Sequence, residues 1–127
     1  MSSVILDASA LLALIRNEAG AGTVKAALPS AGICAVNLSE VVAKLIGHGQ
    51  SASTVRASLG ALNLTVHDMT AALAYDAGEL RAVTKPFGLS LGDRCCLALA
   101  RQLAVPALTS DRAWASLRLG IAIQLIR

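Results

Sequence analysis

Short apolar runs alternate along the chain with longer segments of helical pattern. The first run, residues 3–6 (SVIL), carries two β-favouring residues and predicts a strand. Further short runs predict strands at residues 32–36, 64–66, 105–109 and 121–126. Short strands that alternate with helices favour an α/β fold, in which a parallel or mostly parallel sheet of four to five strands has helices on both faces.

The segments between these strands carry the spacing of helices, with capping residue types at their starts and Gly or Pro near their ends. The segment LLALIR favours a helix, and the two glycines between residues 17 and 22 separate it from the next one. The predicted helices cover residues 11–16, a segment ending near residue 29, then 37–46, a segment from 51 or 53 to 62, one from 68 or 70 to 85, residues 90–104, and a short segment around Trp114.

The size and composition of the chain set limits on its class. A chain of 127 residues with 55% hydrophobic residues can bury one core, so we expect a single domain over residues 1–127. The longest apolar stretch, residues 4–15, is interrupted by Asp7 and is shorter than the roughly 20 residues of a membrane-spanning helix. No Lys or Arg precedes it, as one would in a signal peptide. We therefore expect a cytoplasmic protein without membrane association.

Cysteine usage and charge refine this expectation. Cys34, Cys95 and Cys96 make an odd number, and the adjacent pair lacks the C-x-x-C spacing of zinc and redox sites, so we expect buried reduced thiols. The net charge is +3, from 11 basic and 8 acidic residues. If several acids share one pocket, the remaining surface is basic, which suits a polyanionic substrate.

Four acidic residues stand at junctions between predicted strands and helices. Asp7 and Asp111 each follow an apolar strand and precede a helix, so each fits a helix N-cap. Glu40 and Asp93 each lie three residues after an Asn or a Ser, so each fits the N3 position of a capping box. For any one of these residues alone, a capping role is the simpler interpretation.

The placement of the four acids together supports a second interpretation. The carboxyl ends of parallel strands lie along one edge of a sheet, and the following helices begin there with their positive dipole ends. Acids at such positions can converge in one crevice, where they repel one another unless a cation neutralises them. Carboxylates without a nearby His favour Mg²⁺ or Mn²⁺ over zinc, and such ions activate water for attack on a phosphodiester. We therefore expect the metal-ligating and catalytic residues to be Asp7, Glu40, Asp93 and Asp111.

Four segments, VILDASALLALI, NLSEV, LSLGDRCCLALA and LTSDRAW, resemble in order and spacing the signature segments of PIN-domain proteins. The resemblance covers residues 4 to about 115, and the short length is similar to that of VapC-type toxins of bacterial toxin–antitoxin pairs. It implies a sheet of four or five parallel strands and a Mg²⁺- or Mn²⁺-dependent endoribonuclease that inhibits translation by cutting RNA. It also implies that Asp7 is the first metal ligand, Glu40 the helix-borne acid and Asp93 the acid at a helix start. Asp111 matches a more variable fourth acid, which acts through a water or on a second metal.

Several neighbours of these acids match supporting residues of the same family. Ser9, Thr109 and Ser110 match small hydroxyl residues that orient ligands or waters, although turn and capping chemistry accounts for them equally well. Arg94 and Arg112 each follow a candidate acid, so they either contact phosphate or a carboxylate, or form surface salt bridges.

Other charged and aromatic residues are expected to lie outside the site. Lys44 and Lys85 would extend an RNA-facing patch if they pointed toward it, but we interpret them as solvated helix charges. We expect Trp114 to pack the last helix against the sheet. The titratable residues that we leave out of the site are His48, His67, Asp76 and Glu79.

The resemblance also implies protein partners. A VapB-like antitoxin would place an extended tail near the acidic pocket, where an Arg meets the carboxylates, and the chain would form a homodimer. The apolar helical segments at residues 10–15 and 41–62 are candidate contact surfaces.

The alternative function is a non-catalytic RNA- or protein-binding α/β module whose acids serve only as helix caps. A haloacid-dehalogenase-type phosphatase is disfavoured, because its D-x-D motif reads Asp7-Ala8-Ser9 here, and a receiver domain is disfavoured because the paired acids and late Lys are missing.

Overall fold

Five strands form one parallel sheet in the computed structural model, which describes residues 1–127. The strands are β1 (Val4–Leu6), β2 (Ala31–Cys34), β3 (Thr65–His67), β4 (Ala107–Thr109) and β5 (Ile123–Leu125), in the spatial order β3-β2-β1-β4-β5. The central strand β1 pairs in parallel with both β2 and β4, so that Ile5 lies opposite Gly32 on one side and Ala107 on the other. The predicted α/β fold with a parallel sheet is confirmed.

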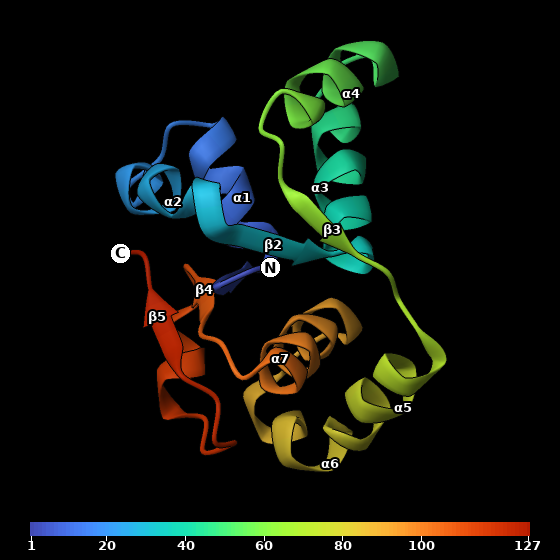
Figure 1. Ribbon diagram of the computed structural model, residues 1–127, viewed down its shortest axis with the longest axis vertical. Coiled ribbons are helices and arrows are strands. Elements are labelled where there is room, and N and C mark those ends of the chain that lie inside the picture. The colour runs from blue at the N-terminus through green and yellow to red at the C-terminus, as the bar shows by residue number, and fades with distance from the viewer.

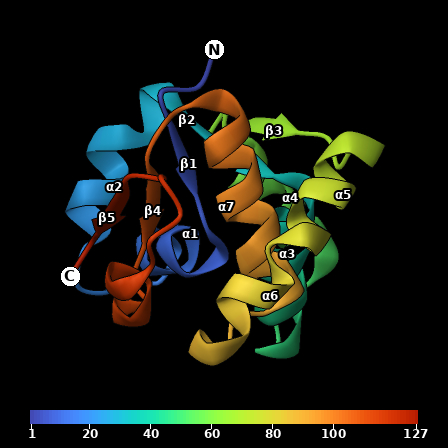
Figure 2. The same ribbon diagram turned by 90° about the horizontal axis from the view of Figure 1, so that it is seen from below.

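Helices cover both faces of this sheet (Figure 1), as the alternation of strands and helices predicts. One layer holds α1 (Ala8–Ile15), α2 (Ala21–Ala27), α3 (Ala35–Gly47) and α4 (Ala52–Gly60), and the other holds α5 (Ala71–Glu79), α6 (Arg81–Thr84) and α7 (Leu91–Leu103). Short 3-10 helices lie in three of the connections: η1 (Leu28–Ser30), η2 (Lys85–Phe87) and η3 (Arg112–Ser116). Figure 2 shows α7 running alongside β1, the central strand. None of the helices combines the length and apolarity needed to span a lipid bilayer.

Alternate residues of the central strand point into two separate apolar cores. Ile5 belongs to the core beneath α5 and α7, and the fully buried Trp114 lies in the same core, as predicted from the sequence. Leu6 belongs to the opposite core, with residues of α1, α3 and α4. The two cores fix the sheet between rigid helical layers, so its carboxyl edge is a firm base for side chains.

All three cysteines are buried free thiols, which confirms the expectation from the sequence. Burial raises the pKa of the Cys95 thiol to about 11 and that of the Cys96 thiol well above its usual range. Both thiols therefore stay protonated at neutral pH and act as small apolar core residues.

Three predicted helices differ from the structure. The helix expected over residues 11–16 begins at Ala8, in the segment that was expected to form a turn. The helix expected from residue 37 begins at Ala35, so Asn37 lies inside α3 and does not cap it. The helix expected to reach residue 85 is divided near Leu80 into α5 and α6. There the Leu80 carbonyl accepts both the Thr84 N–H, at 3.0 Å, and the Thr84 hydroxyl, at 2.7 Å. Such bonds from a hydroxyl to the preceding turn bend helices.

Candidate active site

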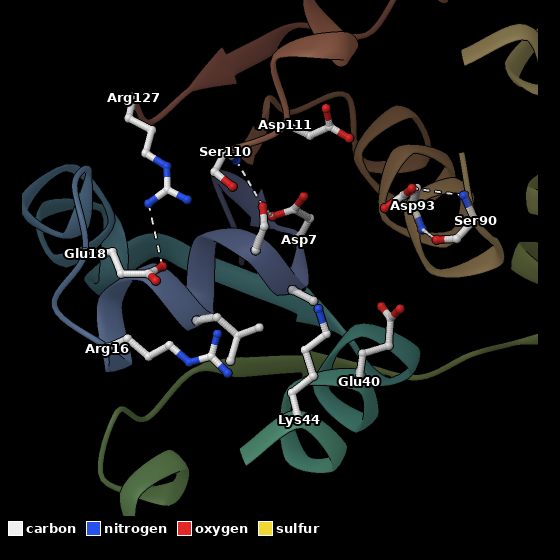
Figure 3. Close-up of a pocket in the computed structure, with 13 residues that line it drawn as sticks. Asp7, Arg16, Glu18, Glu40, Lys44, Ser90, Asp93, Ser110, Asp111 and Arg127 are labelled. Atoms are coloured by element: carbon white, nitrogen blue, oxygen red, sulfur yellow. Dashed lines mark hydrogen bonds and ion pairs between the residues drawn. The ribbon is translucent and has the colours of Figure 1, made fainter. Parts of the chain in front are cut away.

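The strand order brings the ends of β1 and β4 together at the carboxyl edge of the sheet. The chain passes from β1 to β2 and β3 on one side and returns to β4 and β5 on the other. This reversal is a topological switch point, where open parallel sheets form a crevice. A cavity of about 380 Å³ lies there (Figure 3), lined by Asp7, Ala8, Ser9, Leu12, Arg16, Glu18, Glu40, Lys44, Ser90, Asp93, Ser110, Asp111 and Arg127.

All four acids singled out in the sequence line this one cavity. Asp7 follows β1, Glu40 lies on α3, Asp93 is in the first turn of α7, and Asp111 follows β4 (Figure 3). None of them has a Lys, Arg or His within salt-bridge distance, because the single ion pair of the chain joins Arg127 and Glu18. The cavity therefore concentrates negative charge that no protein cation neutralises directly.

Asp7 is the most buried of these acids and the most tightly held. Its side chain is 4% exposed and caps α1 by accepting the Ala10 N–H at 2.8 Å. It also accepts the hydroxyls of Ser9, at 2.7 Å, and Thr109, at 2.5 Å. Burial raises the pKa of this carboxyl to about 6 although these three hydrogen bonds lower it, and the nearby Asp93 raises it further. Asp7 thus has a fixed orientation and a costly charge, which a bound cation would stabilise.

The hydroxyl residues predicted to support the site join the two loops at the switch point. The Ser9 hydroxyl accepts the Ser110 N–H at 3.0 Å while it donates to Asp7. The Thr109 hydroxyl accepts the Asp111 N–H at 3.0 Å and also donates to Asp7. Each hydroxyl therefore links the loop after β1 to the loop after β4 and orients the Asp7 carboxylate.

Asp93 and Asp111 combine a capping role with a place in the cavity. Ser90 and Asp93 form the predicted capping box of α7, in which the Ser90 N–H donates to Asp93 Oδ2 at 2.9 Å. Asp111 caps η3 by accepting the Ala113 N–H on Oδ1 at 3.0 Å. Each of the two carboxylates keeps one oxygen without a hydrogen-bond partner in the protein, and that oxygen is available to a ligand.

Glu40 is not in a capping box, so this prediction was wrong. Because α3 begins at Ala35, Glu40 lies in its second turn, and the Asn37 side chain bonds to it directly. Asn37 Nδ2 donates to Glu40 Oε1 at 3.0 Å and to the Gly92 carbonyl at 2.9 Å, which ties α3 to the start of α7. An ideal Cβ on Gly92 would lie 2.5 Å from Glu40 Oε2, so the carboxylate occupies the space that any side chain at Gly92 would fill.

Sequence reasoning missed Asn37 and Gly92. Asn37 is 1% exposed and its Oδ1 atom has no hydrogen-bond partner, which marks a polar residue buried for a specific purpose. A signal for Gly92 was present, because Gly is a poor helix former and here stands in the first turn of α7 beside a candidate acid.

Other residues considered in the sequence lie away from the carboxylates. Arg94 turns toward α5, where its guanidinium donates to the Ala77 carbonyl at 3.0 Å. His67 bonds to Ser2 at 2.9 Å, and His48 contacts the main chain at the end of α3. The remaining residues that do not line the cavity are Arg112, Lys85, Asp76 and Glu79. Lys44 does line it, together with Arg16, Glu18 and Arg127, which no sequence motif singled out.

Comparison with known protein families agrees with this geometry, because the family model described as the PIN domain matches residues 4–118. The chain belongs to the PIN-domain family. No curated protein sequence matches this PIN domain.

Some solved structures that are similar to this PIN domain are described as a toxin–antitoxin complex or as a toxin. A chain from a toxin–antitoxin complex of Klebsiella pneumoniae is 20% identical, with a TM-score of 0.76 and coverage of 98% of both chains. The DNA-bound VapBC of Salmonella typhimurium is 18% identical, with a TM-score of 0.74 and full coverage (100%) of both chains. The VapC20 toxin of Mycobacterium tuberculosis, described as cleaving the sarcin-ricin loop, is 22% identical, with a TM-score of 0.73 and coverage of 94% of this chain and 99% of that one. At these identities the likeness shows the fold.

The donor atoms of the PIN-domain cavity suit a hard divalent cation. The candidate ligands are carboxylate oxygens with neighbouring hydroxyls, and the cavity contains no His or Cys. No group of three or more His, Cys, Asp and Glu side chains lies close enough together to chelate an ion directly. Mg²⁺ binds proteins through one or two carboxylates and keeps several waters. An ion in this cavity would accordingly be held by one or two of the four carboxylates and by the others through water.

Proposed function

We propose that this PIN domain is a Mg²⁺- or Mn²⁺-dependent endoribonuclease, the toxin of a type II toxin–antitoxin pair, which cleaves RNA in the cytoplasm and thereby inhibits translation. The observation that carries this proposal is the gathering of four carboxylates from four separate segments into one cavity without a protein cation beside them. Acids that served only as helix caps would have no reason to share a cavity, where their charges repel. The alternative of a non-catalytic module with capping acids is therefore less well supported.

The residues of the cavity would have different roles toward a bound ion and the substrate. A divalent ion bound there supplies Lewis acidity for the attack of water on a phosphodiester. Asp7, fixed by Ala10, Ser9 and Thr109, provides the rigid ligand. Asp93 and Asp111 each offer an oxygen that has no partner in the protein and can accept a hydrogen bond from water or bind the ion.

Two substitutions test the nuclease proposal against the capping alternative. Asp7→Asn and Asp93→Asn should each weaken Mn²⁺ binding in titration calorimetry and lower Mg²⁺-dependent RNA cleavage by at least about 100-fold, because each removes a ligand charge. Asp76→Asn is the matched control, since Asp76 lies on α5 outside the cavity and should behave like the unaltered protein. Wild-type cleavage rates in both site variants would contradict the assignment of Asp7 and Asp93 to the active site of a nuclease.

We also infer a VapB-like antitoxin as partner. The Klebsiella and Salmonella structures are described as a toxin–antitoxin complex and as VapBC bound to DNA. In this chain, a groove of about 740 Å³ lies between α3, α4 and β3, and eight of its 12 lining residues are hydrophobic. Ile46 and Val66 on this groove are 44% and 43% exposed. Half of the 12 residues that line the groove fall in the predicted surface segment 41–62, whereas residues 10–13 of the other segment are buried.

A variant of the apolar groove tests whether the antitoxin binds there. Ile46→Asp should weaken binding of the antitoxin encoded by the neighbouring gene and leave RNA cleavage unchanged, because Ile46 does not line the acidic cavity. Unchanged antitoxin affinity in a pull-down would contradict this groove as the docking site. The homodimer implied by the resemblance stays a prediction, which light scattering of the purified protein measures.

A further inference from the structure

The acidic cavity also has a basic side. Arg16 at the end of α1, Lys44 on α3 and Arg127 after β5 line it together with the carboxylates (Figure 3). We propose that Arg16 and Lys44, with Arg127 beside them, form a phosphate subsite that binds the RNA backbone next to the phosphodiester held at the carboxylates. The proposal rests on the RNA-cleaving function proposed above and adds the direction in which the substrate strand leaves the carboxylates.

Arg16 and Lys44 are not neutralised by the carboxylates of the cavity. Neither Arg16 nor Lys44 has a carboxylate within 4.0 Å, since the single ion pair joins Arg127 to Glu18 at 3.6 Å. Lys44 follows Glu40 by four residues on α3, a spacing at which Glu and Lys commonly pair. Figure 3 shows instead that Glu40 turns toward the Asp93 side of the cavity while Lys44 extends toward α1. A cavity with separated charges of both signs suits a cation at one end and an anion at the other.

Arg127 is held at the rim of the cavity, whereas Arg16 keeps hydrogen-bond donors free. Arg127 donates to the Ala19 carbonyl at 3.1 Å, which fixes its guanidinium beside the cavity. Arg16 Nη2 lies 3.3 Å from His48 Nδ1, and the same ring nitrogen lies 2.7 Å from the Lys44 carbonyl. A ring nitrogen that donates its proton to this carbonyl cannot also accept one from Arg16. The Arg16 guanidinium therefore keeps donors free for a ligand.

Arg16 and Asp7 lie at opposite ends of α1. Arg16 follows Asp7 by nine residues, from the N-cap of α1 to its C-cap, which corresponds to about 13 Å along a helix. Arg16 therefore lies at the other end of α1 from Asp7, where it can contact another phosphate of the same strand. A nucleic acid backbone repeats its phosphates along the strand, so one molecule reaches both ends of the cavity.

Three site variants and two control variants test this proposal. The site variants are Arg16→Ala, Lys44→Ala and the double variant. The controls are Arg101→Ala and Lys25→Ala, because these residues are exposed, lie in the last turns of α7 and α2, and do not line the cavity. All five proteins should unfold at closely similar temperatures, since the replaced side chains lie at the surface.

The experiment measures binding of a labelled single-stranded RNA by anisotropy in EDTA, where metal-dependent cleavage does not occur, over a series of KCl concentrations. Each site variant should bind about tenfold more weakly, as expected for loss of one charged hydrogen bond. The slope of log affinity against log salt should become shallower by about 0.7 for each lost phosphate contact, and so by about 1.4 in the double variant. In Mg²⁺, KM should rise with kcat unchanged, and both controls should match the unaltered protein.

The outcomes separate this proposal from the nuclease proposal. If the unaltered protein binds RNA through Arg16 and Lys44 but does not cleave it, the phosphate subsite stands and the nuclease fails. If it cleaves RNA and the double variant has the same KM and salt slope, the nuclease stands and the subsite fails. Unchanged RNA affinity combined with lost binding of polyglutamate would assign the basic side to an acidic protein segment and overturn the proposal. Absence of RNA binding by the unaltered protein would also overturn it.

Discussion

At the scale of single residues, Asp7 illustrates the conflict between folding and the site. Its carboxylate is nearly fully buried, and three hydrogen bonds do not compensate for lost hydration, because its pKa remains raised to about 6. A residue chosen for stability alone would be neutral at this position. On the nuclease proposal, the charge serves as a fixed anionic ligand, and the fold supplies the free energy that this charge costs.

The raised pKa of Asp7 predicts how stability depends on pH without metal. The folded protein binds this proton more tightly than the unfolded chain, whose Asp titrates near 3.8, while the folded pKa is about 6. The contribution of Asp7 is therefore fully present below about pH 4 and is lost as pH rises through 6, by about 3 kcal/mol in total. Asp7→Asn should lack this loss and be more stable than the unaltered protein at pH 7.5.

Urea unfolding in EDTA at several pH values measures this effect. The difference between the Asp7→Asn variant and the unaltered protein reports on Asp7 together with its charge interaction with Asp93, because titratable groups far from Asp7 contribute equally to both. Parallel stability curves for the two proteins between pH 4 and pH 7 would contradict the prediction.

At Gly92, a substitution that stabilises the helix should weaken metal binding in the cavity. Gly92→Ala would place a methyl group against the Glu40 carboxylate, which lies at the end of a flexible side chain and can move away. Thermal unfolding should therefore show equal or higher stability, since Ala favours helices by up to about 1 kcal/mol over Gly. Calorimetry should show Mn²⁺ binding weakened by about tenfold, because Glu40 is displaced from its place beside Asn37.

A double-mutant cycle tests whether Gly92 acts through Glu40. In a Glu40→Ala background, Gly92→Ala should have no further effect on Mn²⁺ affinity. A further loss of the same size in that background would show that the methyl group disturbs something other than the Glu40 carboxylate.

At the scale of secondary-structure elements, contacts between residues close in the sequence were predictable, and contacts between distant segments were not. The capping box of Ser90 and Asp93 was predictable because its two members are three residues apart and both groups belong to one helix start. The environment of Glu40 was not, because its partner Asn37 is fixed by a carbonyl 55 residues away on α7. The division between α5 and α6 was also missed, and no motif in the sequence marks the hydrogen bond from the Thr84 hydroxyl to the Leu80 carbonyl at this point.

The end of α7 gives a prediction at this scale. The helix ends at Ala104, which has φ 55° and ψ 44°, a left-handed conformation that costs L-residues roughly 1 kcal/mol. Ala104→Gly should therefore raise stability by about 0.5–1 kcal/mol, or by about 2–4 °C in Tm. The same substitution at Ala74, an exposed interior position of α5, should lower stability by about 1 kcal/mol. A lower Tm for Ala104→Gly in a thermal melt would contradict this account.

At the scale of the whole molecule, the class of fold was predictable and the arrangement around the acids was not. Alternating short strands and helices predict a parallel sheet, and acids at strand ends predict a shared edge. The basic side was missed because it depends on long-range packing. Arg16 and Arg127 belong to no motif and are far apart in the sequence, yet α1 and the segment after β5 bring both to the same cavity.

The position of β1 between β2 and β4 governs when the site comes into existence during synthesis. The bond from Thr109 to Asp7 spans 102 residues, so the first strand to emerge from the ribosome waits for one of its neighbours until most of the chain has been made. Asp93 and Asp111 also arrive late, after β1, β2 and β3. A nascent or prematurely terminated chain therefore has an open sheet edge and an incomplete acid cluster. The order of the strands therefore delays assembly of the acid cluster until most of the chain has been made.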